Sequence, residues 1–278
     1  MPNLENIFTP ESLSEASSFL QTHGDEAKVV GAGTDLLLSL GSTRFLVSLS
    51  RVGLNYIKTD NKSIIIGSMT AIADIANDTL LNEQPYSILK TAARLFGTRQ
   101  IRNRATIGGN ICSAVPSADM PVPLVALDAK AVVYGSEGER TVSLEDFIVD
   151  YRRVDLRKGE MLKEIQIPLL GTGSRGSFSK VGRTSVDIAL VNCSVRTDST
   201  PSDFRIVLGA VGPTPIRATR AERFLKQSGV LNKTQFSQVA RLAAEETKPI
   251  GDIRASSEYR RAMSELLVYR SLMQIASL

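Results

Sequence analysis

Residues 98–121 read TRQIRNRATIGGNICSAVPSADMP, and the fold is inferred outward from their centre, Thr106-Ile107-Gly108-Gly109-Asn110. Two adjacent glycines and an Asn, preceded by Thr and followed by Ser113, Ser117 and Asp119, predict a turn of positive φ that points several backbone N–H groups one way. Such a turn binds an anion. The alternative is a plain tight turn, since Gly-Gly-Asn alone is usually no more than that.

An earlier stretch has the same chemistry. Val29-Val30-Gly31-Ala32-Gly33-Thr34-Asp35-Leu36 runs from an apolar strand into small residues and then into a hydroxyl and a carboxylate. Two turns that each bind an anion indicate a ligand with one diphosphate, which both turns contact. Gly31-Ala-Gly33 nearly matches the dinucleotide fingerprint G-x-G-x-x-G, but Leu36 stands where the third glycine belongs, so no Rossmann site is expected. No G-x-x-x-x-G-K-[ST] occurs, which excludes a P-loop.

These two stretches resemble the FAD-binding loops in the flavoprotein subunit of molybdenum hydroxylases, the family that contains xanthine dehydrogenase and carbon monoxide dehydrogenase. Three later stretches resemble that subunit's C-terminal domain, in the family's order. They are residues 178–189, then LGAVGPTPIRATRAERFL at 208–225, then SSEYRRAMSELLVYRSL at 256–272. The resemblance covers practically the whole chain.

The resemblance implies an α+β fold of two domains. Residues 1–172 would form a FAD-binding domain of the vanillyl-alcohol-oxidase (PCMH) type, with subdomains at about 1–57 and 58–172. Residues 173–278 would form a C-terminal domain of a small antiparallel sheet plus helices. A chain of 278 residues is long enough for two domains that each bury a core.

The resemblance also implies which residues contact FAD. The first loop would hold the adenine side and the diphosphate, and the second would hold the diphosphate from the other side. Phe96, Asp119, Leu162 and Lys180 match family positions that touch the cofactor. The candidate cofactor-binding residues are therefore Val29, Val30, Gly31, Ala32, Gly33, Thr34, Asp35, Leu36, Phe96, Thr106, Ile107, Gly108, Gly109, Asn110, Asp119, Leu162 and Lys180.

Some of these positions have a second interpretation. Asp119 is either a ligand of a cofactor hydroxyl or a cap in its loop. Cys112, which the resemblance places near the isoalloxazine ring, is interpreted as a small apolar filler rather than a redox thiol. The chain departs from the family in its first loop, where Gly31-Ala32-Gly33 replaces Ala-Gly-Gly, and at Thr184, where Arg is common.

The function implied is electron transfer. In this family a large molybdenum subunit hydroxylates the substrate, and a small subunit relays electrons through two [2Fe–2S] clusters. The flavin subunit passes them to NAD⁺, dioxygen or another acceptor. No catalytic residue is assigned to this chain. Two rival hypotheses are a free-standing FAD oxidase of the vanillyl-alcohol-oxidase type and a non-enzymatic maturation factor of the same fold.

The composition of the chain limits the kinds of partner and the cellular location that we expect. The apolar fraction is 42%, the charged fraction 22% and the net charge +4, and no apolar run approaches the roughly 20 residues needed to span a membrane. The start, MPNLENIFTPESL, has neither a basic beginning nor an apolar core, so a cytoplasmic protein is expected. Arg99, Arg102 and Arg104 are either a solvated face or support for an anionic cofactor or a partner. Aromatic residues make up 5% with no Trp, which argues against nucleic-acid binding.

No metal site is expected. Cys112 and Cys193 are the two cysteines, they lie far apart, and neither forms a C-x-x-C pair. A [2Fe–2S] cluster normally takes four cysteines. His23 is the single histidine, and beside Gly24 it is interpreted as part of a helix end.

The pattern of apolar residues predicts the order of elements. Thr9 as N-cap and Pro10 at the first position predict a helix that closes at His23-Gly24. A helix with Tyr86, Leu89 and Ala93 on its buried face is expected to end at Phe96. The remaining expectations are helices at 70–77 and 121–127, strands at 27–30, 45–49, 63–66, 130–134, 140–143 and 162–167, a linker at 171–176, three strand-like runs at 177–181, 188–195 and 204–211, and two final amphipathic helices.

Overall fold

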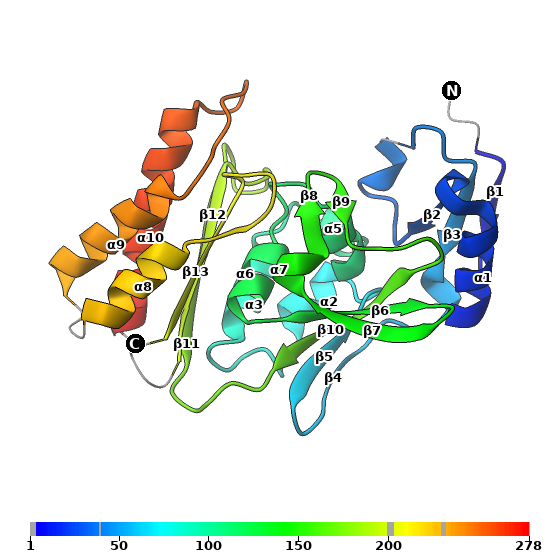
Figure 1. Cartoon of the computed structure of the whole chain (residues 1–278), viewed down its shortest axis with the longest axis horizontal. Coiled ribbons are helices and arrows are strands. Elements are labelled where there is room, and N and C mark those ends of the chain that lie inside the picture. The colour runs from blue at the N-terminus through cyan, green and yellow to red at the C-terminus, as the bar shows by residue number, and fades with distance from the viewer. Residues whose placement is uncertain (1–3, 39, 199–202, 229–231, 278) are drawn as a thin grey trace.

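The computed structural model describes residues 4–38, 40–198, 203–228 and 232–277 (Figure 1). Its first unit is a parallel sheet in the order β1-β3-β2, made of Asn6–Phe8, Phe45–Ser48 and Ala27–Val30. Both strands expected in this region are found. Helix α1 (Leu13–His23) packs on the sheet, and the 3-10 turns η1 (Gly24–Glu26), η2 (Leu36–Leu38) and η3 (Leu49–Arg51) connect the elements.

The start of α1 was predicted wrongly. The helix begins at Leu13 rather than at Pro10, and its N-cap is Ser12. The Ser12 hydroxyl accepts a hydrogen bond from the Glu15 N–H at 3.1 Å, which satisfies a donor of the first turn. Thr9 and Pro10 therefore precede the helix, although their pattern is typical of a helix start.

The second unit is an antiparallel sheet in the order β4-β5-β10-β6-β7. Its hydrophobic core lies between this sheet and a layer of short helices, where Ile66, Ile107 and Ile165 are fully buried (Figure 1). The strands are β4 (Ile57–Thr59), β5 (Ser63–Gly67), β10 (Met161–Pro168), β6 (Lys130–Gly135) and β7 (Gly138–Ser143). The helices are α2 (Ile72–Asn77), α3 (Ser87–Arg94), α4 (Arg99–Arg102), α5 (Ile107–Cys112), α6 (Pro121–Ala126) and α7 (Leu144–Phe147). A hairpin of β8 (Ile148–Asp150) and β9 (Arg153–Val154) follows α7. Helix α3 ends two residues before the expected Phe96.

The last unit is a sheet in the order β11-β12-β13-β14, all antiparallel. Its strands are Arg175–Val181, Val191–Thr197, Phe204–Gly209 and Ile216–Arg217. Helices α8 (Thr219–Ser228), α9 (Lys233–Glu245) and α10 (Ser257–Ser277) cover one face, and α3 and α6 lie against the other (Figure 1). The α+β class and the C-terminal antiparallel sheet with helices are confirmed, with α8 in addition to the two expected helices.

Strand β11 begins inside the stretch expected to be a linker. The Gly176 N–H donates to Gln84 Oε1 at 2.8 Å, and a Cβ at Gly176 would lie 2.6 Å from Ile88 Cγ2. Gly176 is therefore a position where the strand packs tightly on α3. This close approach, rather than a flexible link, accounts for the glycine.

Candidate functional site

A cleft of about 1530 Å³ runs between the first unit and the second. Its walls are the end of β2 with the following residues 31–38, helix α5, strand β10 and the turn at 156–160 that precedes β10. Residues 186–188, from the connection between β11 and β12, also line it. The volume exceeds the 300–1,000 Å³ of most small-ligand pockets, so the cleft accommodates an extended ligand.

The first loop, residues 31–35, follows β2 directly. The backbone N–H groups of Ala32, Gly33 and Thr34 have no acceptor among the described residues. Gly33 has φ +73°, and the Leu37 side chain packs against it. Because several neighbouring donors are left free at the wall of a cleft, this loop is suited to an anion.

The second loop differs from the sequence prediction. Residues 107–112 form α5, with Thr106 as N-cap, and the positive φ expected for Gly108 and Gly109 is wrong. The Gly109 N–H donates to Thr106 Oγ1 at 3.1 Å, and the Gly108 N–H donates to Ser68 O at 2.9 Å. The N–H groups of Ile107 and Asn110 are also occupied. The N–H groups of residues 107–110 are therefore not the free donors that we expected, and the two glycines provide space instead.

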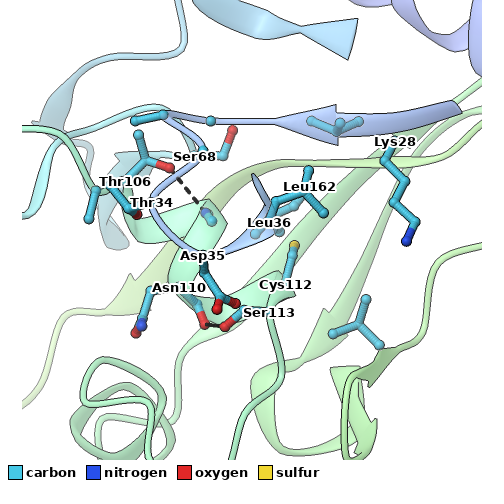
Figure 2. A pocket seen from close by; sticks show the side chains of 18 of the residues that line it. Lys28, Thr34, Asp35, Leu36, Ser68, Thr106, Asn110, Cys112, Ser113 and Leu162 are labelled. Carbon is cyan, nitrogen blue, oxygen red and sulfur yellow. Dashed lines mark hydrogen bonds between the residues drawn. The ribbon is translucent and has the colours of Figure 1, made fainter. Parts of the chain in front are cut away.

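Close contacts explain one glycine of each loop, Gly31 and Gly108. A Cβ at Gly31 would lie 2.5 Å from Thr106 Oγ1, which brings the two loops together. A Cβ at Gly108 would lie 2.7 Å from both Cβ and O of Ser68. Figure 2 shows Asp35 of the first loop pointing toward Asn110 and Ser113 of the second. The glycines are thus needed for the close approach of the two walls, one of which carries the free N–H donors of the first loop.

Ser68 is a site residue that sequence reasoning missed. It lines the cleft, it is 4% exposed, and its hydroxyl has no hydrogen-bond partner in the described part of the chain. Figure 2 shows this hydroxyl beneath the first loop. A buried hydroxyl without a partner is costly, so it marks a place where a ligand group fits. No sequence signal distinguishes Ser68 from an ordinary strand-end serine.

Asp119 lies at the end of the cleft that is nearest to the C-terminal sheet. It is 4% exposed, and its Oδ2 accepts from Lys180 Nζ at 2.6 Å. Lys180 also donates to the carbonyl of Leu95 at 3.1 Å, next to Phe96. Burial raises the pKa of the Asp119 carboxyl, while Lys180 and Asn192 act in the opposite direction. The pair therefore joins the cleft wall to the C-terminal sheet.

The structure brings most of the candidate residues to one cleft. Val30, Ile107 and Lys180 are the exceptions: Val30 and Ile107 do not line it, and Lys180 reaches it only through Asp119. Ile107 is fully buried in the core of the second unit. The candidates that line the cleft are Val29, Gly31, Ala32, Gly33, Thr34, Asp35, Leu36, Phe96, Thr106, Gly108, Gly109, Asn110, Asp119 and Leu162.

Cys112 also lines the cleft, and it packs against the core of the second unit, which includes Leu162 (Figure 2). Burial raises the pKa of its thiol to about 12. A thiol with this pKa stays protonated at neutral pH, and a protonated thiol is a poor nucleophile. This supports its interpretation as a small apolar filler.

Two further observations concern the described residues taken together. Among the described residues, no group of three or more His, Cys, Asp and Glu side chains is placed to hold a metal ion. Within the same residues, no helix has the length and apolar character required to cross a membrane.

Comparison with known proteins gives matches over nearly the entire length. Residues 3–170 match the family model of the FAD binding domain in molybdopterin dehydrogenase, and residues 176–275 match that of the CO dehydrogenase flavoprotein C-terminal domain. The chain is 31% identical to the glyceraldehyde dehydrogenase medium chain of Sulfolobus acidocaldarius, over 96% of each chain. It is 30% identical to the carbon monoxide dehydrogenase medium chain of Hydrogenophaga pseudoflava, over 95% of this chain and 94% of the relative. A solved carbon monoxide dehydrogenase from that organism superposes with a TM-score of 0.94, at 29% identity, over 100% of this chain and 99% of the other.

Proposed function

The chain belongs to the family of FAD-binding medium subunits of molybdenum hydroxylases, and we propose that it transfers electrons from [2Fe–2S] clusters of a partner subunit to NAD⁺ or another acceptor. Its cofactor is FAD, and it is a subunit of an oxidoreductase. The observation that carries the proposal is the cleft, in which the free donors of the first loop face α5 across the contact between Gly31 and Thr106.

We propose that the diphosphate of FAD lies against the first loop. The N–H groups of Ala32, Gly33 and Thr34 supply donors for a charge of about −2, whose burial without partners is very costly. The hydroxyls of Thr106 and Ser68 lie at the opposite wall. The part played by Ile107 to Asn110 is then mainly to leave space, since their N–H groups are already used.

The two ends of FAD extend away from the diphosphate along the cleft. We propose that Val29 contacts the adenine side, that Phe96 and Asp119 contact the flavin side, and that Leu162 also touches the cofactor. Val30 and Ile107 support the walls without lining the cleft, and Lys180 acts through Asp119. Bound FAD supplies a carrier that takes up one or two electrons. The described residues then bind and orient it and exclude water. No residue of this chain is proposed as a catalytic acid or base.

We also propose that the chain works in a complex. Relatives are named as medium chains or FAD-binding subunits, and we infer from this a small iron–sulfur subunit and a large subunit with the molybdenum cofactor. We further propose that the complex is cytoplasmic, that residues 1–172 and 173–278 form the two domains, and that 1–57 and 58–172 are the subdomains of the first.

The experiment is anaerobic bleaching of the flavin by hydroxylase substrates, namely purines, aldehydes and aromatic acids. The chain alone is expected to stay oxidised, while chemical reductant bleaches it. Co-purified with its iron–sulfur and molybdenum subunits, it is expected to bleach with one of these substrates. Rapid bleaching of the lone chain by an organic substrate would instead establish a free-standing oxidase. Failure to retain FAD would favour a maturation factor.

A further inference from the structure

One row of residues crosses the C-terminal sheet beside the cleft. The strand register places Lys180 of β11 opposite Asn192 of β12, and Asn192 opposite Gly209 of β13. Because directly opposed residues point to the same face of a sheet, Lys180 and Asn192 share a face. Both side chains reach Asp119, which lies just before α6, so this is the face away from α8, α9 and α10 (Figure 1).

Asn192 is placed to hold the carboxylate of Asp119. It is fully buried, and its Nδ2 donates to Asp119 Oδ1 at 3.1 Å and to the Ala118 carbonyl at 3.3 Å. Lys180 occupies the other carboxylate oxygen, Oδ2. Each oxygen of the carboxylate therefore has one donor from the C-terminal sheet, and together the two donors fix both its position and its rotation.

The Asn192 side chain is not explained by the stability of the fold. Its Oδ1 is buried with no partner among the described residues, which is a cost that a leucine of similar volume would avoid. A side chain at Gly209 would collide with Asn192 Oδ1 and with Val122, so Gly209 leaves the space that the amide fills. A buried polar group kept at such a cost is typical of a functional site.

We propose that Asn192 is a positioning residue, which with Lys180 fixes the Asp119 carboxylate at the flavin end of the cleft and thereby helps to set the potential at which bound FAD accepts electrons. This inference rests on the proposed function. A fixed negative charge in a poorly solvated site acts strongly on a neighbouring redox group, because little water screens it. The anion disfavours the addition of electrons, so it keeps the potential low.

The pKa of Asp119 indicates how the effect of its negative charge on the flavin potential would be lost. Burial raises the pKa of this carboxyl, and the hydrogen bond from Asn192 is one of the interactions that oppose the rise. Without the hydrogen bond from Asn192, the pKa of Asp119 rises further, so the carboxyl binds its proton more tightly. A protonated Asp119 leaves the buried Lys180 ammonium without its counter-charge, and the potential of the flavin rises.

The test compares Asn192→Leu with Ser194→Ala in the full-length chain reconstituted with FAD. Ser194 is a matched control because it lies two residues along β12 from Asn192, on the same face, and is also fully buried. Its hydroxyl donates to the Ser177 carbonyl at 3.4 Å, and it does not line the cleft. The readouts are the FAD dissociation constant, the midpoint potential from anaerobic titration with reference dyes, and the melting temperature.

Asn192→Leu is expected to weaken FAD binding about tenfold, because an Asp119 carboxylate that is free to rotate loses its own hydrogen bond to the cofactor, and to raise the midpoint potential. Ser194→Ala is expected to change only the melting temperature. Asp119→Asn should raise the potential as well, and adding Asn192→Leu to it should have little further effect, because no carboxylate is left to hold. If Asn192→Leu does not fold, Asn192→Ala carries the same test.

Two outcomes contradict the inference in different ways. If the wild-type chain binds FAD and Asn192→Leu matches it in both dissociation constant and midpoint potential, then Asn192 is purely structural and the proposed function stands. If the wild-type chain does not bind FAD, both the proposed function and the inference are overturned. A shift in melting temperature alone counts as the structural result.

Discussion

Gly31 lies so close to Thr106 that a Cβ on Gly31 would be 2.5 Å from Thr106 Oγ1. These residues are far apart in sequence and belong to different units, so their contact fixes the distance between the walls of the cleft. Thr106 is already engaged as the N-cap of α5, where its hydroxyl accepts from the Gly109 N–H. Its side chain cannot move away without loss of that cap.

Gly31→Ala is therefore expected to weaken FAD binding at least tenfold, since the new methyl separates the two loops. Gly31 does not have positive φ, so the substitution adds no backbone strain. Gly251→Ala is the control, because a Cβ there meets only atoms at 3.6 Å or beyond, in a loop that does not line the cleft. Fluorescence titration with FAD measures both. Equal affinity of Gly31→Ala and wild type would show that the contact does not govern the cleft.

The two glycines of α5 are expected to behave differently. A Cβ at Gly108 would press on the backbone of Ser68, and overpacking of this kind costs about 1–3 kcal/mol, so Gly108→Ala should lower the melting temperature. Gly109 lines the cleft and a Cβ there meets only Thr106 Oγ1 at 3.0 Å. Gly109→Val should therefore keep the fold and lose flavin. Circular dichroism and flavin content separate the two effects, and a Gly109→Val chain with full flavin would contradict the prediction.

Lys180→Met is expected to destabilise the chain more strongly as pH rises. Breaking a buried ion pair costs about 3–5 kcal/mol, because the remaining charge has no partner. Burial already raises the pKa of Asp119 in the folded state, and loss of Lys180 raises it further. A raised folded-state pKa means that protonated Asp119 is tolerated at low pH and that stability is lost as pH rises through this pKa.

Urea denaturation from pH 4 to pH 8 measures this effect. Lys163→Met is the control, since Lys163 pairs with the more exposed Glu139 at 2.7 Å, and such pairs contribute about 0–1 kcal/mol. A constant difference between Lys180→Met and wild type over the pH range would show that Asp119 does not titrate there.

The cysteines are expected to react slowly in the native chain. Burial raises the pKa of Cys112 and of Cys193 to about 12, so the fraction of thiolate at pH 8 is very small. A colourimetric thiol reagent should label both only after unfolding, and bound FAD should protect Cys112 further. Labelling of one thiol in the folded chain with a midpoint near pH 7 would show an activated cysteine.

Local patterns predicted the first wall of the cleft well. Strand β2 and the loop at Gly31 to Asp35 follow from an apolar run that ends in small residues, and both lie where expected. The second loop was predicted less well, because two glycines favour a turn and the N-cap bond of Thr106 makes a helix instead. In the second loop, hydrogen bonding and packing on Ser68 outweighed the preference of the two glycines for a turn.

The remaining site residues could not be found from sequence. Ser68 is recognisable only by its lack of a partner, and Asn192 only by its hydrogen bond to Asp119. Both features depend on contacts between segments about 40 or more residues apart, which no local pattern records. The resemblance to a family located Lys180 and Asp119, and the structure adds that they bind each other.

The proposed role of the cleft is tested most directly by the identity of the flavin that the purified full-length chain retains. The flavin is released by heat in the dark and identified by mass analysis, after reconstitution with an excess of FAD where the chain is purified without it. The account predicts FAD in close to one equivalent, because in the proposed binding mode the first loop and the wall at Thr106 together hold a diphosphate. Recovery of FMN, or of no flavin after reconstitution, would contradict it.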